Sequence, residues 1–164
     1  MPNVRRRIER EGGEEVLGWK IWEWYGVMIE AEFHMVWRSP GGVLRDITPN
    51  QLPFEQILFL PDPSLTYLGR QVNNIRCPLN ADPRVVDFIR DANEFFLIQN
   101  EGDRAALSDI SETISNEERA RLKFLLARRA LLEAEISNST PRRNELCRCG
   151  SGRKYKKCCG RVAS

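Results

Sequence analysis

Hydrophobic and polar residues alternate along one segment in the N-terminal part of the chain. The apolar set is Val27, Ile29, Ala31, Phe33, Met35 and Trp37, and the largely polar set between them is Met28, Glu30, Glu32, His34, Val36 and Arg38. A period of two residues is typical of a β-strand with one buried face. The turn sequence 39–42 follows, so residues 43–48 are predicted to return as the second strand of a hairpin. The apolar run 57–60 predicts a third strand.

Two helices are predicted in the second half of the chain. Asp82 followed by Pro83 is a typical helix start, and the apolar periodicity continues to about Gln99. Ser115 and Glu118 have the spacing of a capping box, which opens a longer helix that ends near Ile136. The apolar stripe of this helix is Leu122, Leu125, Leu126, Leu132 and Ile136. Because strands precede helices, the order predicts an α+β fold, with a small antiparallel sheet followed by helices.

Composition and charge divide the chain into two parts. The 164 residues are 41% hydrophobic and 29% charged, without an apolar run of about 18 residues or an export signal, which excludes a membrane span and predicts a cytoplasmic location. The net charge of +2 conceals an asymmetry, because residues 141–164 carry a net charge of +7 and residues 1–140 one of −5. We therefore predict an α+β body over 1–136, a polar linker over 137–141 and a basic module over 142–164.

Four of the five cysteines lie in the basic module. Cys147 and Cys149 are separated from the pair Cys158 and Cys159 by eight residues, among which Gly152 belongs to a flexible Gly-Ser-Gly turn. Zn²⁺ prefers four thiolate or imidazole ligands in a tetrahedron, so this spacing indicates a zinc site. A disulfide alternative requires either a strained bond between adjacent cysteines or an oxidising compartment.

The segment from Pro141 to Gly160 resembles the SEC-C motif, the zinc module at the C-terminus of the translocase ATPase SecA. The resemblance covers about residues 142–161 and includes Arg143-Asn144, the Gly-Ser-Gly turn and Lys154-Tyr155-Lys156. It implies that Cys147, Cys149, Cys158 and Cys159 are the zinc ligands. In SecA the module contacts the chaperone SecB, ribosomes and phospholipid, so the resemblance implies a docking role.

The region around His34, the only histidine, resembles the His and Asp segments of transglutaminase-like and papain-like cysteine hydrolases. There a histidine base on one strand is oriented by an aspartate on the next, and Asp46 occupies the second position here. A five-residue hairpin loop pairs Arg38 with Leu44 and puts His34 and Asp46 on one face, whereas a four-residue loop separates them. This chain departs from the family because no cysteine precedes His34, and Cys77 follows it. A two-ligand metal site at Glu32 and His34 is a further alternative.

Two functions follow from these features. The first is that of a cytosolic zinc-binding protein whose basic module docks on an acidic protein surface or on ribosomal RNA. The docking residues are Arg153, Lys154, Lys156 and Lys157. The alternative is a cysteine hydrolase-like or transglutaminase-like enzyme, or an inactive relative, that uses His34 and Asp46. The missing upstream cysteine favours the first.

Overall fold

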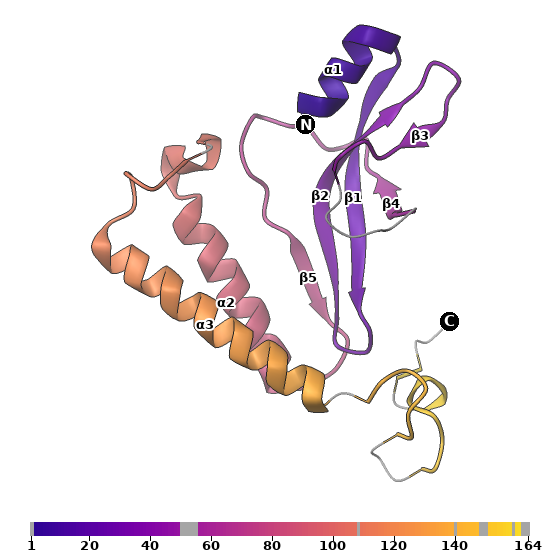
Figure 1. Ribbon diagram of the computed structural model, residues 1–164, viewed down its shortest axis with the longest axis vertical. Coiled ribbons are helices and arrows are strands. Elements are labelled where there is room, and N and C mark those ends of the chain that lie inside the picture. The colour runs from indigo at the N-terminus through magenta and orange to yellow at the C-terminus, as the bar shows by residue number, and fades with distance from the viewer. Residues whose placement is uncertain are drawn as a thin grey trace. The chain divides into compact units, whose positions relative to one another are not determined.

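A computed structural model describes residues 2–49, 56–107, 109–139, 141–147, 151–158 and 160–161 (Figure 1). The strands are β1 (Glu14–Trp24), β2 (Met28–Arg38), β3 (Leu44–Arg45), β4 (Leu58–Pro61) and β5 (Ile75–Pro78). The helices are α1 (Pro2–Glu11), α2 (Pro83–Gln99) and α3 (Asn116–Ser139), with short 3₁₀ turns η1 (Gly102–Ala106) and η2 (Tyr155–Lys157). This combination confirms the α+β class. None of the described helices is long and apolar enough to cross a membrane.

The described strands form one five-stranded sheet around the pair β1 and β2. The order is β3-β2-β1-β4, and β5 also pairs with β2. β3 runs antiparallel to β2, with Arg38 opposite Leu44, so the chain adopts the register with the five-residue loop. The ladder covers only Leu44 and Arg45, which makes this strand shorter than the predicted segment 43–48.

The chain separates into two compact units. Unit one contains residues 1–22 and 31–75, and unit two contains residues 23–30 and 76–164, so strands β1 and β2 contribute to both. The core of unit one consists of Val4, Met35 and Trp37, which are covered by Ile8, Leu17 and Ile47. Val4 is 1% exposed, so helix α1 packs on this core.

Unit two is built on the turn of the β1–β2 hairpin and on α2 and α3, which lie side by side (Figure 1). Its core consists of Val27, Met28, Val85, Phe88 and Ile136. Both predicted helix starts are confirmed: the Asp82 carboxylate accepts from the backbone N–H of Arg84, and Ser115 and Glu118 each accept from the other's N–H.

Four details differ from the sequence-based expectations. Helix α3 continues to Ser139, so residues 137–139 of the predicted linker are helical. Leu126 is 50% exposed and does not belong to the buried stripe of α3. Strand β2 buries His34 and Val36 from its polar set while Ile29 is 37% exposed, because side chains cover parts of both faces of the sheet. Strand β5 was not predicted, since its four residues carry no clear alternation.

Candidate functional site

The C-terminal segment forms a small loop structure held by backbone hydrogen bonds. An isolated antiparallel bridge joins Leu146 to Lys154. Beside it, the N–H of Cys147 donates to the carbonyl of Arg153 at 2.7 Å, and the N–H of Tyr155 donates to the carbonyl of Glu145 at 2.7 Å. The chain reverses between these arms at Gly152, which has a φ of +67°. The chain therefore returns Arg153 and Lys154 to the side of the arm that carries Cys147.

Two of the four predicted ligands lie in the described part of this segment. Cys147 is 7% exposed, and Cys158 is half-buried directly after η2, where its N–H donates to the carbonyl of Tyr155 at 3.0 Å. The hydroxyl of Ser151 lies 3.0 Å from the sulfur of Cys158. Cys149 and Cys159 lie outside the described residues. Within the described residues, no group of three or more His, Cys, Asp or Glu side chains comes together.

The donor set fits zinc on chemical grounds. The bridge between Leu146 and Lys154 ties the arm that carries Cys147 to the start of η2, which leads to Cys158. Thiolates are the preferred zinc ligands, and a hydroxyl next to a ligand sulfur is a typical outer hydrogen-bond partner of such a site.

Tyr155 of η2 packs against the turn of the β1–β2 hairpin, within unit two. Its side chain is 8% exposed, and its ring meets that of Tyr25 edge-on at 6.0 Å between centroids. The Tyr25 hydroxyl donates to the carbonyl of Gly160 at 2.9 Å, and the Arg143 guanidinium lies 5.6 Å from the Tyr25 ring centroid. Residues near both ends of the cysteine-rich segment, Arg143 and Gly160, therefore contact the hairpin turn through Tyr25.

Two glycines make this close packing possible. Gly26, in the hairpin turn, has a φ of +70°, and a Cβ atom there would overlap the Tyr155 hydroxyl. A Cβ atom at Gly160 would meet the Tyr155 ring at 2.6 Å. Neither glycine was singled out from the sequence. The nearest signal is the Tyr25-Gly26 pair in a turn, which by itself does not say what packs there.

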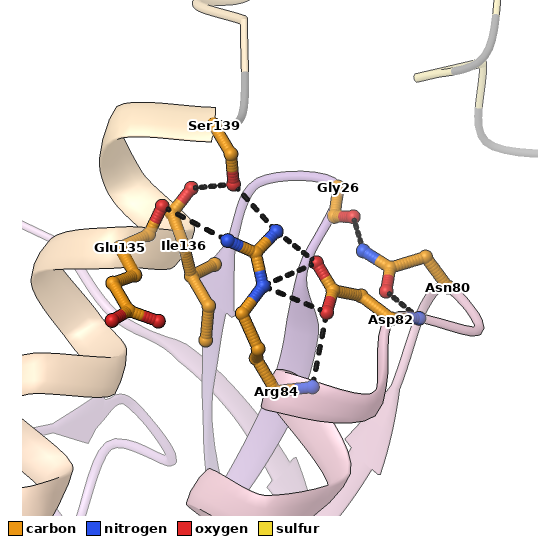
Figure 2. A network of polar contacts seen from close by, with 7 residues as sticks. All are labelled: Gly26, Asn80, Asp82, Arg84, Glu135, Ile136 and Ser139. Atoms are coloured by element: carbon orange, nitrogen blue, oxygen red, sulfur yellow. Dashed lines mark hydrogen bonds and ion pairs between the residues drawn. The ribbon is translucent and has the colours of Figure 1, made fainter.

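A polar network fixes the same hairpin turn to both long helices (Figure 2). The amide of Asn80 donates to the carbonyl of Gly26 at 2.7 Å, and its oxygen accepts from the N–H of Asp82. Arg84 joins the Asp82 carboxylate at 2.6 Å to the Ser139 hydroxyl at 2.8 Å. The Arg84 hydrogen bonds hold the pKa of Asp82 below its ordinary value. The end of α3, which leads into the cysteine-rich segment, is thus held beside the start of α2.

The basic residues predicted for docking lie on the outside of the segment. Arg153, Lys154 and Lys157 are exposed, and Lys156 is half-buried. The N–H of Lys156 is bonded to the carbonyl of Arg143 at 3.1 Å, and that of Lys157 to the carbonyl of Lys154 at 2.8 Å, so their backbone is ordered by the fold of the segment. The charges are therefore displayed by the same loops that carry the thiols.

His34 and Asp46 come together in unit one. The His34 Nε2 atom lies 3.0 Å from Asp46 Oδ1, and both side chains are less than 10% exposed. The two groups are in direct contact, but the contact lacks hydrogen-bond geometry. Lys20 Nζ approaches the other carboxylate oxygen at 3.8 Å, and the Phe59 ring packs against the imidazole at 6.4 Å between centroids.

Burial alone would raise the pKa of Asp46. The N–H of Thr48, which donates to Oδ1 at 3.0 Å, and the nearby His34 lower this pKa by more than burial raises it, so the net pKa is below the ordinary value. A lowered folded-state pKa adds stability at pH values above the unfolded pKa of about 4, and this stability is lost as the pH falls through the folded-state pKa.

We expect Asp46→Asn to destabilise the protein at pH 7 and the difference from wild type to shrink at pH 3, as measured by urea unfolding. An equal difference at both values would contradict the assignment.

Two further residues of the body were candidates from the sequence. Cys77 is exposed on β5 and belongs to unit two. The Glu32 carboxylate accepts a hydrogen bond from the Trp22 indole at 2.8 Å, which gives it a structural partner. Unit one, which holds His34 and Asp46, contains no cysteine in its sequence.

Comparisons with known proteins find similarity over part of the chain. The SEC-C motif model matches residues 143–161. The protein translocase subunit SecA of Geotalea uraniireducens is 38% identical over 53 residues, which cover 32% of this chain and 6% of that protein. SecA of Chlorobium phaeobacteroides is 55% identical over 31 residues, 19% of this chain and 3% of that protein.

A UPF0225 protein of Serratia proteamaculans is 36% identical over 66 residues, which cover 40% of this chain and 36% of that protein. The chain therefore matches only a small part of the SecA proteins and about a third of the UPF0225 protein. No solved structure matches. Residues 143–161 of this chain carry a SEC-C motif, as their cysteine spacing predicted.

Proposed function

We propose that this chain is a cytoplasmic zinc-binding protein whose SEC-C motif docks on an acidic protein or ribosomal partner. The observation that carries the proposal is the folded loop in which Cys147 is buried while Arg153, Lys154 and Lys157 are exposed. The match of the motif to SecA, named as a translocase subunit, supports a role in recognition.

Cys147, Cys149, Cys158 and Cys159 would hold the metal. When bound, Zn²⁺ supplies a structural crosslink between the two arms of the loop, which have too little apolar surface to fold alone. Four thiolates and one divalent ion reduce the formal charge of residues 141–164 from +7 to about +3. The module therefore stays basic in its metal-bound form, opposite in sign to the body and to an acidic partner.

Zinc content tests the ligand assignment. The purified, reduced protein is expected to hold about one Zn²⁺ per chain, and Cys147→Ser to lose it, because three thiolates bind the metal far more weakly than four. Cys77→Ser is the matched control, since Cys77 is exposed on β5 outside the motif, and it should retain the metal. Metal analysis after dialysis decides the matter: metal-free wild-type protein, or full retention in Cys147→Ser, would contradict the proposal.

Salt and charge test the docking role. Replacing Arg153, Lys154, Lys156 and Lys157 with glutamine should weaken partner binding at least tenfold without releasing zinc, because exposed charges act through screened attraction over about 8 Å at physiological salt. The matched control neutralises four exposed cations outside the motif, namely Arg5, Arg6, Arg10 and Lys123.

Co-sedimentation with purified ribosomes and pull-down from lysate, each at low and high salt, provide the measurement. The proposal would be contradicted if binding does not depend on the salt concentration, or if it weakens equally in the motif variant and in the control variant. The docking surface would then lie outside the motif.

The pair His34 and Asp46 supports a second candidate, a relative of cysteine hydrolases. The observation that favours this candidate is the buried contact of 3.0 Å between the His34 imidazole and the Asp46 carboxylate. Residues 1–75 contain no cysteine, so unit one supplies a base and its orienting group without a nucleophile. An active enzyme of this kind would need a nucleophile from outside residues 1–75. Hydrolysis of a generic thioester or amide probe that disappears in His34→Ala would instead support catalysis.

A further inference from the structure

Helix α3 carries two apolar faces on opposite sides. One face contains the buried residues Leu122, Leu125 and Ile136. The other is exposed and consists of Phe124 and Leu131, 51% and 66% exposed, together with Ala120, Ala127 and Ala134. At about 100° per residue, the centres of the two faces lie roughly 150° apart. Because apolar residues occupy both sides, α3 is not a simple amphipathic helix with one solvent face.

The exposed face repeats in steps of four and three residues. Ala120, Phe124, Ala127, Leu131 and Ala134 follow one another at spacings of 4, 3, 4 and 3, which is the a/d repeat of a helix that packs along another helix. Large side chains occupy every a position and alanines every d position. The Arg121 guanidinium, which forms two hydrogen bonds to Glu94, lies 5.1 Å from the Phe124 ring centroid and restricts that side chain.

We propose that this face binds the same face of a second copy of the chain, with the two α3 helices antiparallel. In that arrangement an a position faces a d position, so Phe124 packs opposite Ala134 of the second copy and Leu131 opposite its Ala127. Each large side chain then meets a small one, and the helices interdigitate at even spacing. A parallel pair would instead set Phe124 against Phe124 and leave gaps at the alanines.

The charges of α3 support the antiparallel choice. Arg121 and Arg128 are already paired with acidic residues of α2, whereas Lys123 and Glu135 are exposed beside the repeat. An antiparallel copy that sets Phe124 opposite Ala134 also sets Lys123 opposite Glu135 of the second copy, whereas a parallel copy sets each of these charges beside its own kind. A helix of 24 residues is about 36 Å long and 10 Å wide, so the two contacting faces together amount to roughly 700 Å², which is smaller than the interface of a standard stable complex. The dimer is therefore expected to dissociate on dilution.

Sedimentation velocity of the full-length, zinc-loaded protein over a range of concentrations tests the proposal. The wild type should pass from monomer to dimer as concentration rises. Leu131→Glu should weaken the dimer at least 30-fold, because the substitution acts twice in a symmetric interface and buries two carboxylates. Leu126→Glu is the matched control: it makes the same change at a 50% exposed position of the same helix away from the repeat, and should leave the dimer within about threefold.

Circular dichroism checks that both variants remain folded. A wild type that stays monomeric at all concentrations, or a dimer that tolerates Leu131→Glu, would overturn the proposal. Orientation is tested separately with the photoreactive amino acid benzoylphenylalanine at position 124. The antiparallel dimer crosslinks it to the tryptic peptide 130–142 of the second copy, and crosslinking to peptide 124–128 would instead show a parallel pair and overturn the assigned arrangement.

Discussion

Replacing Gly26 with alanine is expected to destabilise unit two by about 2–5 kcal/mol. Two separate costs add at this position. An alanine in the left-handed region, at a φ of +70°, costs about 1–2 kcal/mol. Its Cβ atom would also overlap the Tyr155 hydroxyl, and making room in a packed site costs about 1–3 kcal/mol. Urea unfolding followed by circular dichroism measures the sum.

Another turn glycine isolates the steric part of this effect. Gly42 has a φ of +83°, but a Cβ atom there has nothing within 4 Å. Gly42→Ala should therefore lower the free energy of unfolding only by the backbone cost of about 1–2 kcal/mol. Removing the ring with Tyr155→Ala should likewise reduce the cost of Gly26→Ala to the backbone part, as a double-mutant cycle would show. Equal costs at Gly26 and Gly42 would mean that Tyr155 does not pack on the hairpin turn.

The same contact connects the candidate metal centre to the body. Tyr155 lies two residues after Arg153, whose carbonyl accepts from the N–H of Cys147, and three residues before Cys158. Its ring is held by Tyr25, from the hairpin turn of unit two. A loop organised by zinc would therefore present Tyr155 to the turn in a fixed position. For this reason the SEC-C motif is better described as a part of unit two than as a freely moving tail.

Local signals predicted most of the helix starts and turns. The cap at Asp82 and the box formed by Ser115 and Glu118 depend on hydrogen bonds between residues two or three positions apart, which a sequence pattern contains in full. The reversal at Gly152 is local for the same reason. The cysteine spacing is also local, and it identified the motif that the family comparison matches.

The contacts that complete the site are not local. Tyr25 and Gly160 are 135 residues apart, and no periodicity connects them. The hairpin register left two arrangements open for His34 and Asp46, and the pairing of Arg38 with Leu44 decided between them. Likewise, the alternation in β2 predicted one buried face, because a strand pattern does not show that further residues cover its second side.

Two adjacent leucines of α3 should respond very differently to truncation. Leu125 is 0% exposed, on the same face as Leu122 and Ile136, whereas Leu126 is 50% exposed. Leu125→Ala removes buried methyl groups and leaves a cavity between packed elements, so we expect a loss of about 2–5 kcal/mol in the free energy of unfolding. Leu126→Ala removes the same atoms from a largely hydrated position and should cost less than about 1 kcal/mol.

The pair is a sharp test because the two substitutions are chemically identical and occupy neighbouring positions of one helix. Helix propensity changes equally in both, so the difference between them reports burial alone. Thermal and urea unfolding at low protein concentration, where the proposed dimer is dissociated, measure the two values on the monomer. The sequence pattern placed both leucines on the same apolar stripe, which predicts similar losses. In the structure Leu125 faces the interior and Leu126 faces the solvent. If the two losses in the free energy of unfolding differ by less than about 1 kcal/mol, both leucines are buried alike, and this orientation of α3 is wrong.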